Sequence, residues 1–188
     1  MLIRAVLREE PITCGDNSSI RAYIHNINEV KVLANMLSTR KSITSLDIRG
    51  YDIGHDIQII FDAINQHRIA LKSLCVSNFL PSLLSLAKFI ESNTTIKELK
   101  LLVDDLTNDD WYQFQLAICR NNTLTSLSMT NNEFNDLDAT CVGRSLQKNQ
   151  GITFLDLSSN KIGDTGAKEL AEIVLVNKYV IVLLSSIA

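Results

Sequence analysis

The stretch that decides the fold runs from Ile152 to Ala167 and reads ITFLDLSSNKIGDTGA. Around Leu155 it alternates apolar and polar residues, which is typical of a β-strand with one face in the core. Beyond it, apolar residues recur at intervals of three and four, which is typical of an amphipathic helix: Ala167, Leu170, Ala171 and Val174. The stretch therefore predicts a strand followed by a helix.

The same pattern recurs along the chain. Going back toward the N-terminus, units begin at Leu124, Ile96, Leu71 and Ile43, at spacings of 28, 28, 25 and 28 residues. Repeats of this length predict a solenoid of stacked units. We expect an α/β solenoid with a concave parallel sheet and convex helices, its strands centred on Leu46, Leu74, Leu99, Leu127 and Leu155.

A polar residue follows each predicted strand. Asn132 and Asn160 are expected to bind backbone groups in the turn between neighbouring units. Asp104 can do so in part, and Tyr51 cannot, because it lacks the side-chain amide.

The best-preserved unit resembles a known family. Residues 155–167 match the pattern LxxLDLSxNxIGDxGA of the ribonuclease-inhibitor type of leucine-rich repeat. This subtype also occurs in NOD-like receptors, Ran GTPase-activating proteins and effectors of intracellular bacteria. The resemblance covers Ile43 to about Val180 and implies a horseshoe-shaped solenoid. It carries over no catalytic residue, because exposed residues decide which partner each member binds.

The repeats divide the chain into two parts. Residues 1–42 are expected to form an N-terminal capping region with a degenerate first repeat. Its predicted helix covers 28–39, its strand lies within 20–24, and residues 1–7 are expected to add a strand or a cap. Residues 43–188 are expected to hold about five leucine-rich repeats, the last incomplete. The unit at Leu71 lacks three residues, and Pro81 predicts a tightened loop there.

Composition narrows the function. The formal net charge of -3, with no basic run, disfavours nucleic acid as a partner, and no stretch is long enough to span a membrane. The four cysteines lie far apart, which favours reduced thiols in the cytoplasm, or in a host cell if the protein is a secreted effector. The three histidines are not at ligand spacing, so neither a metal nor a cofactor is expected.

The residues between the leucines should form the concave surface. The partner-binding residues predicted there are Asp47, Arg49, Lys100, Leu102, Val103, Phe154 and Asp156. Three of them are apolar where exposure to solvent is expected, and exposed apolar residues framed by charge are common at protein interfaces. The alternative interpretation is that scattered apolar surface residues have no function.

Charged and reactive residues outside these columns have simpler explanations. Acidic residues follow the predicted strands and form an acidic edge, and basic residues follow the predicted helices. Helix dipoles favour this arrangement. The alternative is that the acidic edge beside Trp111 and Tyr112 binds a partner. Trp111 is expected to fill the core. Cys75 is expected on the concave surface, but no aligned histidine is available to activate it.

These observations favour a protein-protein interaction module that binds a partner protein on its concave face and is not an enzyme. They also favour an effector-like role. The alternative is a GTPase regulator resembling Ran GTPase-activating proteins, for which Arg49 is expected to be the only arginine on the concave strands. An enzyme using Cys75 or the acidic cluster is the third hypothesis. The apolar residues 180–184 predict a C-terminal edge strand. A second copy in a homodimer, a partner or further residues would cover this strand.

Overall fold

The computed structural model describes residues 13–14, 18–50, 56–77, 83–103, 108–175 and 180–184. Strands and helices alternate along these residues. In chain order they are β1 (Thr13–Cys14), β2 (Ser19–Ile24), α1 (Ile27–Thr39), β3 (Ser45–Gly50), α2 (Ile57–Gln66), β4 (Ser73–Ser77), α3 (Leu83–Ser92), β5 (Glu98–Leu102), α4 (Asn108–Arg120), β6 (Ser126–Ser128), α5 (Asp136–Lys148), β7 (Phe154–Asp156), α6 (Asp164–Val174) and β8 (Ile181–Leu183).

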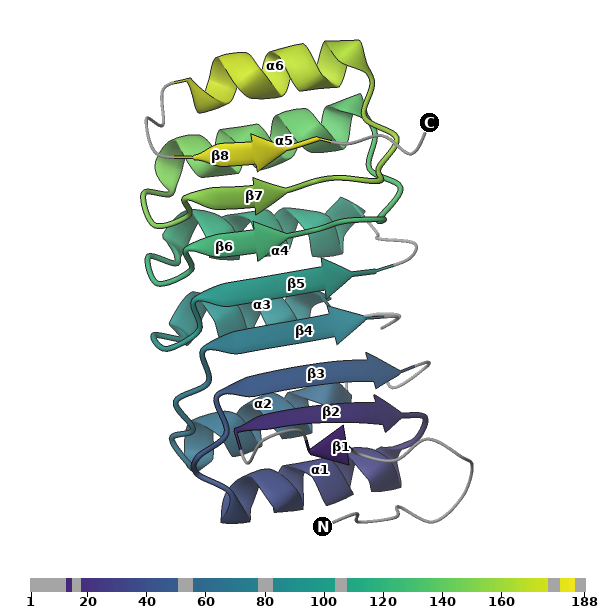
Figure 1. Cartoon of the computed structure of the whole chain (residues 1–188), viewed down its shortest axis with the longest axis vertical. Coiled ribbons are helices and arrows are strands. Elements are labelled where there is room, and N and C mark those ends of the chain that lie inside the picture. Colours follow the sequence, from purple (N-terminus) through teal and green to yellow (C-terminus); the bar gives the residue numbers. More distant parts are fainter. Residues whose placement is uncertain are drawn as a thin grey trace.

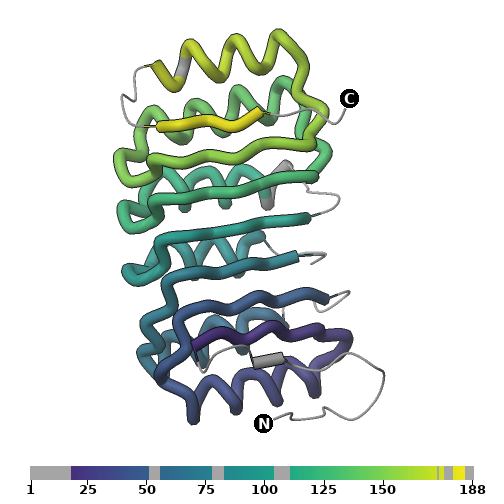
Figure 2. The backbone as a smooth tube through the Cα atoms, viewed as in Figure 1, coloured from purple at the N-terminus to yellow at the C-terminus, as the bar shows by residue number. Residues whose placement is uncertain are grey.

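The strands form one sheet in sequence order, from β1 to β8. The strands from β2 to β8 pair in parallel, and β1 pairs antiparallel with β2. The helices stack in a layer on one side of this sheet (Figure 1), and each strand-helix turn of the chain lies on the one before (Figure 2). The predicted α/β solenoid is therefore confirmed.

The predicted register is also confirmed. One continuous column of paired residues crosses five strands, and each member is at most 1% exposed: Leu46, Leu74, Leu99, Leu127 and Leu155. Because side chains alternate along a strand, this column faces the helices and every second residue faces away. The helix predicted at 28–39 is α1, the strand predicted within 20–24 is β2, and the predicted C-terminal strand is β8.

Two asparagines in the turns after β6 and β7 join neighbouring units. The Asn132 side chain donates to the Leu101 carbonyl at 3.0 Å and accepts from the Val103 amide at 2.6 Å. One unit later, Asn160 donates to the Met129 carbonyl at 2.9 Å and accepts from the Asn132 amide at 2.8 Å. The predicted role of these asparagines is confirmed.

A second asparagine ladder lies at the other end of the units, after the helices. The Asn121 amide group donates to the Ile90 and Asn93 carbonyls at 2.7 and 3.1 Å, and its oxygen accepts from the Thr123 and Leu124 amides at 2.9 and 2.8 Å. Asn149 makes the corresponding four bonds one unit later. Sequence alignment of the units places these asparagines in one column but does not reveal this function.

Helices α5 and α6 pack closely at Gly166, where there is no room for a side chain. A Cβ atom added to Gly166, in the first turn of α6, would lie 2.6 Å from the Asp136 Cα at the start of α5. The Asp136 carboxylate also accepts from the Gly163 amide at 2.7 Å. This contact brings the N-terminal ends of α5 and α6 together and explains Gly166 in the GDTGA sequence.

The core interpretation of Trp111 is confirmed. The Trp111 side chain is 8% exposed, and its ring lies 5.0 Å from the Phe134 ring and 5.8 Å from the Phe114 ring. Four predictions lie outside the described residues: the strand or cap at 1–7, the loop at Pro81, and the turn roles of Tyr51 and Asp104. Among the described helices, none is both long and apolar enough to cross a membrane.

The buried ladder generates a stability prediction. Replacing Asn121 with Ala should lower the free energy of unfolding by about 3 kcal/mol, because two carbonyls and two amides lose their partner in a site where water cannot replace it. The matched control is the exposed neighbour Asn122, whose change to Ala should alter stability by less than about 0.5 kcal/mol. Urea unfolding measures both, and equal effects of the two changes would contradict the ladder's role.

Candidate functional site

The candidate site is the face of the sheet that none of the described helices covers, called the open face below (Figure 1). The strand register arranges its side chains in three columns. The first column is Ser19, Ser45, Ser73, Glu98, Ser126 and Phe154; the second is Arg21, Asp47, Cys75, Lys100, Ser128 and Asp156; the third begins with Tyr23, Arg49, Ser77 and Leu102. The columns on β3–β7 are those predicted from the repeats, and β2 extends them by one strand.

An ion-pair cluster occupies the N-terminal half of this face. Asp47 accepts from the Arg21 Nε at 2.7 Å and from the Arg49 Nη2 at 3.1 Å. Burial of the Asp47 carboxyl opposes its ionisation, but the hydrogen bonds from Arg49 and Arg21 outweigh it and hold its pKa below the usual range. The Arg49 guanidinium also lies 5.8 Å from the centre of the Tyr23 ring. Arg49 is thus held from two sides.

Arg49 is not the only arginine on this face, so that expectation was wrong. Arg21 on β2 pairs in register with Asp47 and its side chain is 51% exposed. The repeat pattern is too degenerate before residue 43 to place Arg21 in a column from sequence alone. The structure places it there because β2 pairs along its whole length with β3.

Cys75 lies on the open face, as its position in the repeat predicts, but its surroundings disfavour the thiolate. Burial, the charge of Asp47 and a hydrogen bond with Asp47 together raise the pKa of the Cys75 thiol to about 11. A nucleophilic cysteine needs a lowered pKa or a neighbouring base. The surroundings of Cys75 therefore do not favour catalysis.

A hollow of about 350 Å³ opens where β2–β5 end. It is lined by Tyr23, His25, Arg49, Gly50, Cys75, Ser77, Lys100 and Leu102. A Cβ atom added to Gly50 would collide with the Ile24 carbonyl oxygen, so the close approach of β2 and β3 beside the hollow requires glycine. Three of the predicted partner-binding residues meet here: Arg49, Lys100 and Leu102.

The prediction that Val103 is exposed was wrong. Val103 is 5% exposed and belongs to the core. It follows Leu101 by two residues, so the alternation of the strand turns it inward, and its amide is held by Asn132. Leu102, between these two inward residues, is half-buried on the open face.

The remaining predicted residues lie on β7, away from the hollow. Phe154 is half-buried in the first column, and Asp156 is half-buried in the second. One Asp156 oxygen accepts from the Ser158 amide at 3.0 Å, which gives this carboxylate a local role in the turn. The predicted residues therefore form two groups and not one continuous patch.

Helix capping accounts for several residues of the acidic edge. Asn135 and Asp138 form a reciprocal capping box at the start of α5, in which Asp138 accepts from the Asn135 amide at 2.9 Å. Glu29 accepts from the His25 amide at 2.6 Å at the start of α1. The densest acidic stretch, at 104–110, has its side chains outside the described residues. Tyr112, just beyond it, is 57% exposed.

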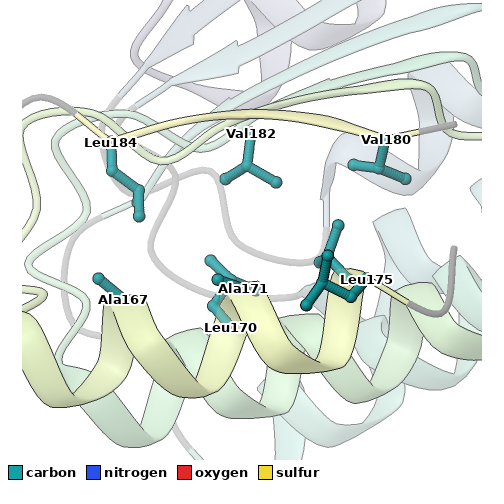
Figure 3. Close-up of a pocket in the computed structure, with 8 residues that line it drawn as sticks. Ala167, Leu170, Ala171, Leu175, Val180, Val182 and Leu184 are labelled. Carbon is teal, nitrogen blue, oxygen red and sulfur yellow. The ribbon is translucent and has the colours of Figure 1, made fainter. Parts of the chain in front are cut away.

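A second hollow lies at the C-terminal end, between α6 and β8. It has a volume of about 400 Å³ and is lined by Ala167, Leu170, Ala171, Val174, Leu175, Val180, Val182 and Leu184. Val180, Val182 and Leu184 of the strand segment face the α6 side chains across it (Figure 3). On the other face of β8, Ile181 is 64% and Leu183 44% exposed. In this part of the described chain, β8 pairs on one side only, with β7.

The described residues contain no group of three or more His, Cys, Asp or Glu side chains placed to hold a metal ion.

Comparison with known proteins identifies the repeats. A family model described as a leucine-rich repeat matches residues 120–143 and 148–171. The first segment contains β6 and the first part of α5, and the second contains β7 and most of α6. The two matched segments are therefore similar to leucine-rich repeats, and the stacked strand-helix units show an α/β solenoid that fits them. No protein with a curated description matches the chain.

Two solved structures are similar to parts of this chain. A Bacteroides fragilis protein matches with a TM-score of 0.55 and 14% identity, over 78% of this chain and 41% of that one. The actin-binding site 2 of leiomodin-1 matches with a TM-score of 0.47 and 22% identity, over 55% of this chain and 61% of that one. The chain therefore spans less than two thirds of either structure, and these identities speak for the fold alone.

The raised pKa of Cys75 generates a prediction about its chemistry. A raised pKa means less thiolate at a given pH, so the rate of Cys75 alkylation by iodoacetamide should still rise about tenfold per pH unit between pH 8 and 10. An unperturbed thiol would level off near its ordinary pKa of about 8.5. Peptide mapping by mass spectrometry gives the rate at Cys75 alone.

The companion variant is Asp47→Asn. Because the charge of Asp47 raises the Cys75 pKa, removing that charge should speed the alkylation of Cys75 at pH 8. A Cys75 rate that levels off below pH 9 in the unmodified chain would show that the thiol is not held protonated.

Proposed function

We propose that this leucine-rich repeat solenoid is a protein-protein interaction module whose open face receives a partner protein. Leucine-rich repeat domains commonly mediate protein-protein interactions. The observation that carries the proposal is the uninterrupted run of parallel strands from β2 to β8, whose outward columns no described helix covers. With neighbouring strands about 4.8 Å apart, the run extends over roughly 29 Å, long enough to meet several turns of a partner's helix or loop.

The rigidity of this face supports binding. The strands hold one another in register, and in the C-terminal units asparagines also bind the backbone at both ends. A surface that is already ordered loses little conformational entropy when a partner docks, which leaves more of the contact energy as affinity. The mixture of charged, hydroxyl and half-buried apolar side chains on the open face also resembles a binding surface more than a core face.

The proposal assigns no enzymatic activity to the chain. The surroundings of Cys75 disfavour its thiolate, which a cysteine nucleophile needs. The alternative of a GTPase regulator has less support, because an arginine that stabilises a nucleotide must be free to reach it. Both Arg21 and Arg49 are bound to Asp47.

We propose that the repeats belong to the ribonuclease-inhibitor subtype, because residues 155–167 resemble it. We infer a cytoplasmic protein, or an effector that acts in the cytoplasm of a host cell, because the three described cysteines are free thiols that a reducing compartment would preserve. Neither a nucleic acid nor a membrane is proposed as a partner. Fractionation of the source cells, with or without a host, tests the location.

A homodimer through β8 is the second part of the proposal. Ile181 and Leu183 are exposed on this strand, and an edge strand with unpaired backbone groups can pair with a copy of itself. A twofold axis would place the two β8 strands antiparallel. The second hollow, between α6 and β8, would lie next to this contact (Figure 3).

The binding surface is tested by capture of partners from a lysate of the source or host cells. The double variant Leu102→Ser with Phe154→Ala should retain less than about a tenth of the partner, because central apolar contacts dominate interface energies. Thermal unfolding should stay nearly unchanged, since both residues are only half-buried. The matched control is Leu137→Ser on α5, which is 70% exposed on the helical side. Equal capture by the double variant would move the interface off the open face.

The dimer is tested by light scattering over a concentration series. The mass should rise toward twice that of the monomer, and Ile181→Lys should return it to the monomer, because like charges would oppose each other across the paired strands. Leu175→Lys, on a residue 78% exposed at the end of α6, is the control. A monomeric mass at every concentration would rule out edge pairing.

A further inference from the structure

The hollow at the ends of β2–β5 carries an excess of positive charge. Among the described residues, Arg21, Arg49 and Lys100 lie on or beside it and Asp47 is the acid between them, so three positive charges meet one negative charge. Glu98 lies on the same face of β5, two residues before Lys100, but does not line the hollow. This positive patch stands out on a chain whose formal net charge is -3.

Two of these cations keep hydrogen-bonding capacity. Lys100 is exposed and forms no ion pair with any described residue. Arg49 uses its Nε and Nη2 atoms on Asp47, while its Nη1 makes no hydrogen bond within the described part of the chain. Arg49 and Lys100 both line the hollow.

The arginine is positioned before any ligand arrives. Its bonds to Asp47 fix one edge of the guanidinium, and the Tyr23 ring lies 5.8 Å from its central carbon. A group that is already held in place loses little side-chain entropy on binding an anion. Tyr23 and Leu102 add apolar walls beside the two cations.

We propose that this hollow receives a carboxylate side chain of the partner protein, next to an apolar residue that packs on Leu102 and Tyr23. The carboxylate would accept from the Lys100 ammonium and from the free edge of Arg49. Charge-assisted hydrogen bonds of this kind are about twice as strong as neutral ones, and strongest where water is partly excluded. This inference rests on the proposed function, because the hollow opens on the face assigned to the partner.

The test uses the full chain and an array of peptides in matched versions. Each peptide has one central residue flanked by leucines and is made with Glu, Gln or phosphoserine at the centre. The chain should bind the Glu versions about tenfold more tightly than the Gln versions, as expected for loss of one charge-assisted bond. The preference should weaken as salt is raised, because the hollow is open to solvent.

The variant Lys100→Gln should reduce the preference for Glu to less than about twofold without changing thermal unfolding, because Lys100 is exposed and unpaired. Lys168→Gln, an exposed lysine on α6, is the matched control and should keep the full preference. Equal binding of Glu and Gln versions, no binding of either, or an unchanged preference in Lys100→Gln would overturn the proposal. Tighter binding of phosphoserine than of Glu would overturn the assignment to a carboxylate.

The capture experiment with the open-face variants keeps the two proposals separate. If the Leu102→Ser, Phe154→Ala variant loses capture but the array shows no preference for Glu, the open face stays the interface. Only the proposal of a bound carboxylate is then overturned. Full capture by that variant would remove the interface itself.

Discussion

The structure depends on buried asparagines that bind the backbone of two units at once. Asn149 is fully buried, and its amide group donates to the Ile118 and Asn121 carbonyls of the preceding unit. Its oxygen accepts from the Gly151 and Ile152 amides, just before β7. The backbone must turn sharply between a helix and a strand, and these polar groups would otherwise lack partners in a buried turn. One side chain thereby satisfies the turn and fixes the spacing between units.

The functional surface follows from this spacing. Fixed units keep the strands in register, and the register places residues about 26–28 positions apart in the chain side by side, as with Arg21, Asp47 and Cys75. A slip of one residue would exchange the buried leucine column for the charged one. In the C-terminal units, the asparagines at the two ends therefore support both the core and the register of the open face.

Much of the fold could be predicted from the sequence, because the leucine alternation and the repeat length are local patterns. The same alternation shows why Val103 is buried, although its apolar character beside Leu102 suggested an exposed pair. The second asparagine ladder was harder to foresee, since its partners are backbone atoms about 28–31 residues away. The hollow at the ends of β2–β5 could not be predicted from the sequence. Its residues Tyr23, Arg49 and Lys100 come from three strands, and one of these strands lies in a degenerate unit.

The asparagine ladder can be observed directly by nuclear magnetic resonance of the ¹⁵N-labelled chain after transfer to heavy water. The side-chain amide protons of Asn121 and Asn149 should persist long after those of the exposed Asn122 and Asn131 have exchanged, because they are buried and bound to carbonyls. Exchange of all four side chains at the same rate would show that the units are not joined in this way.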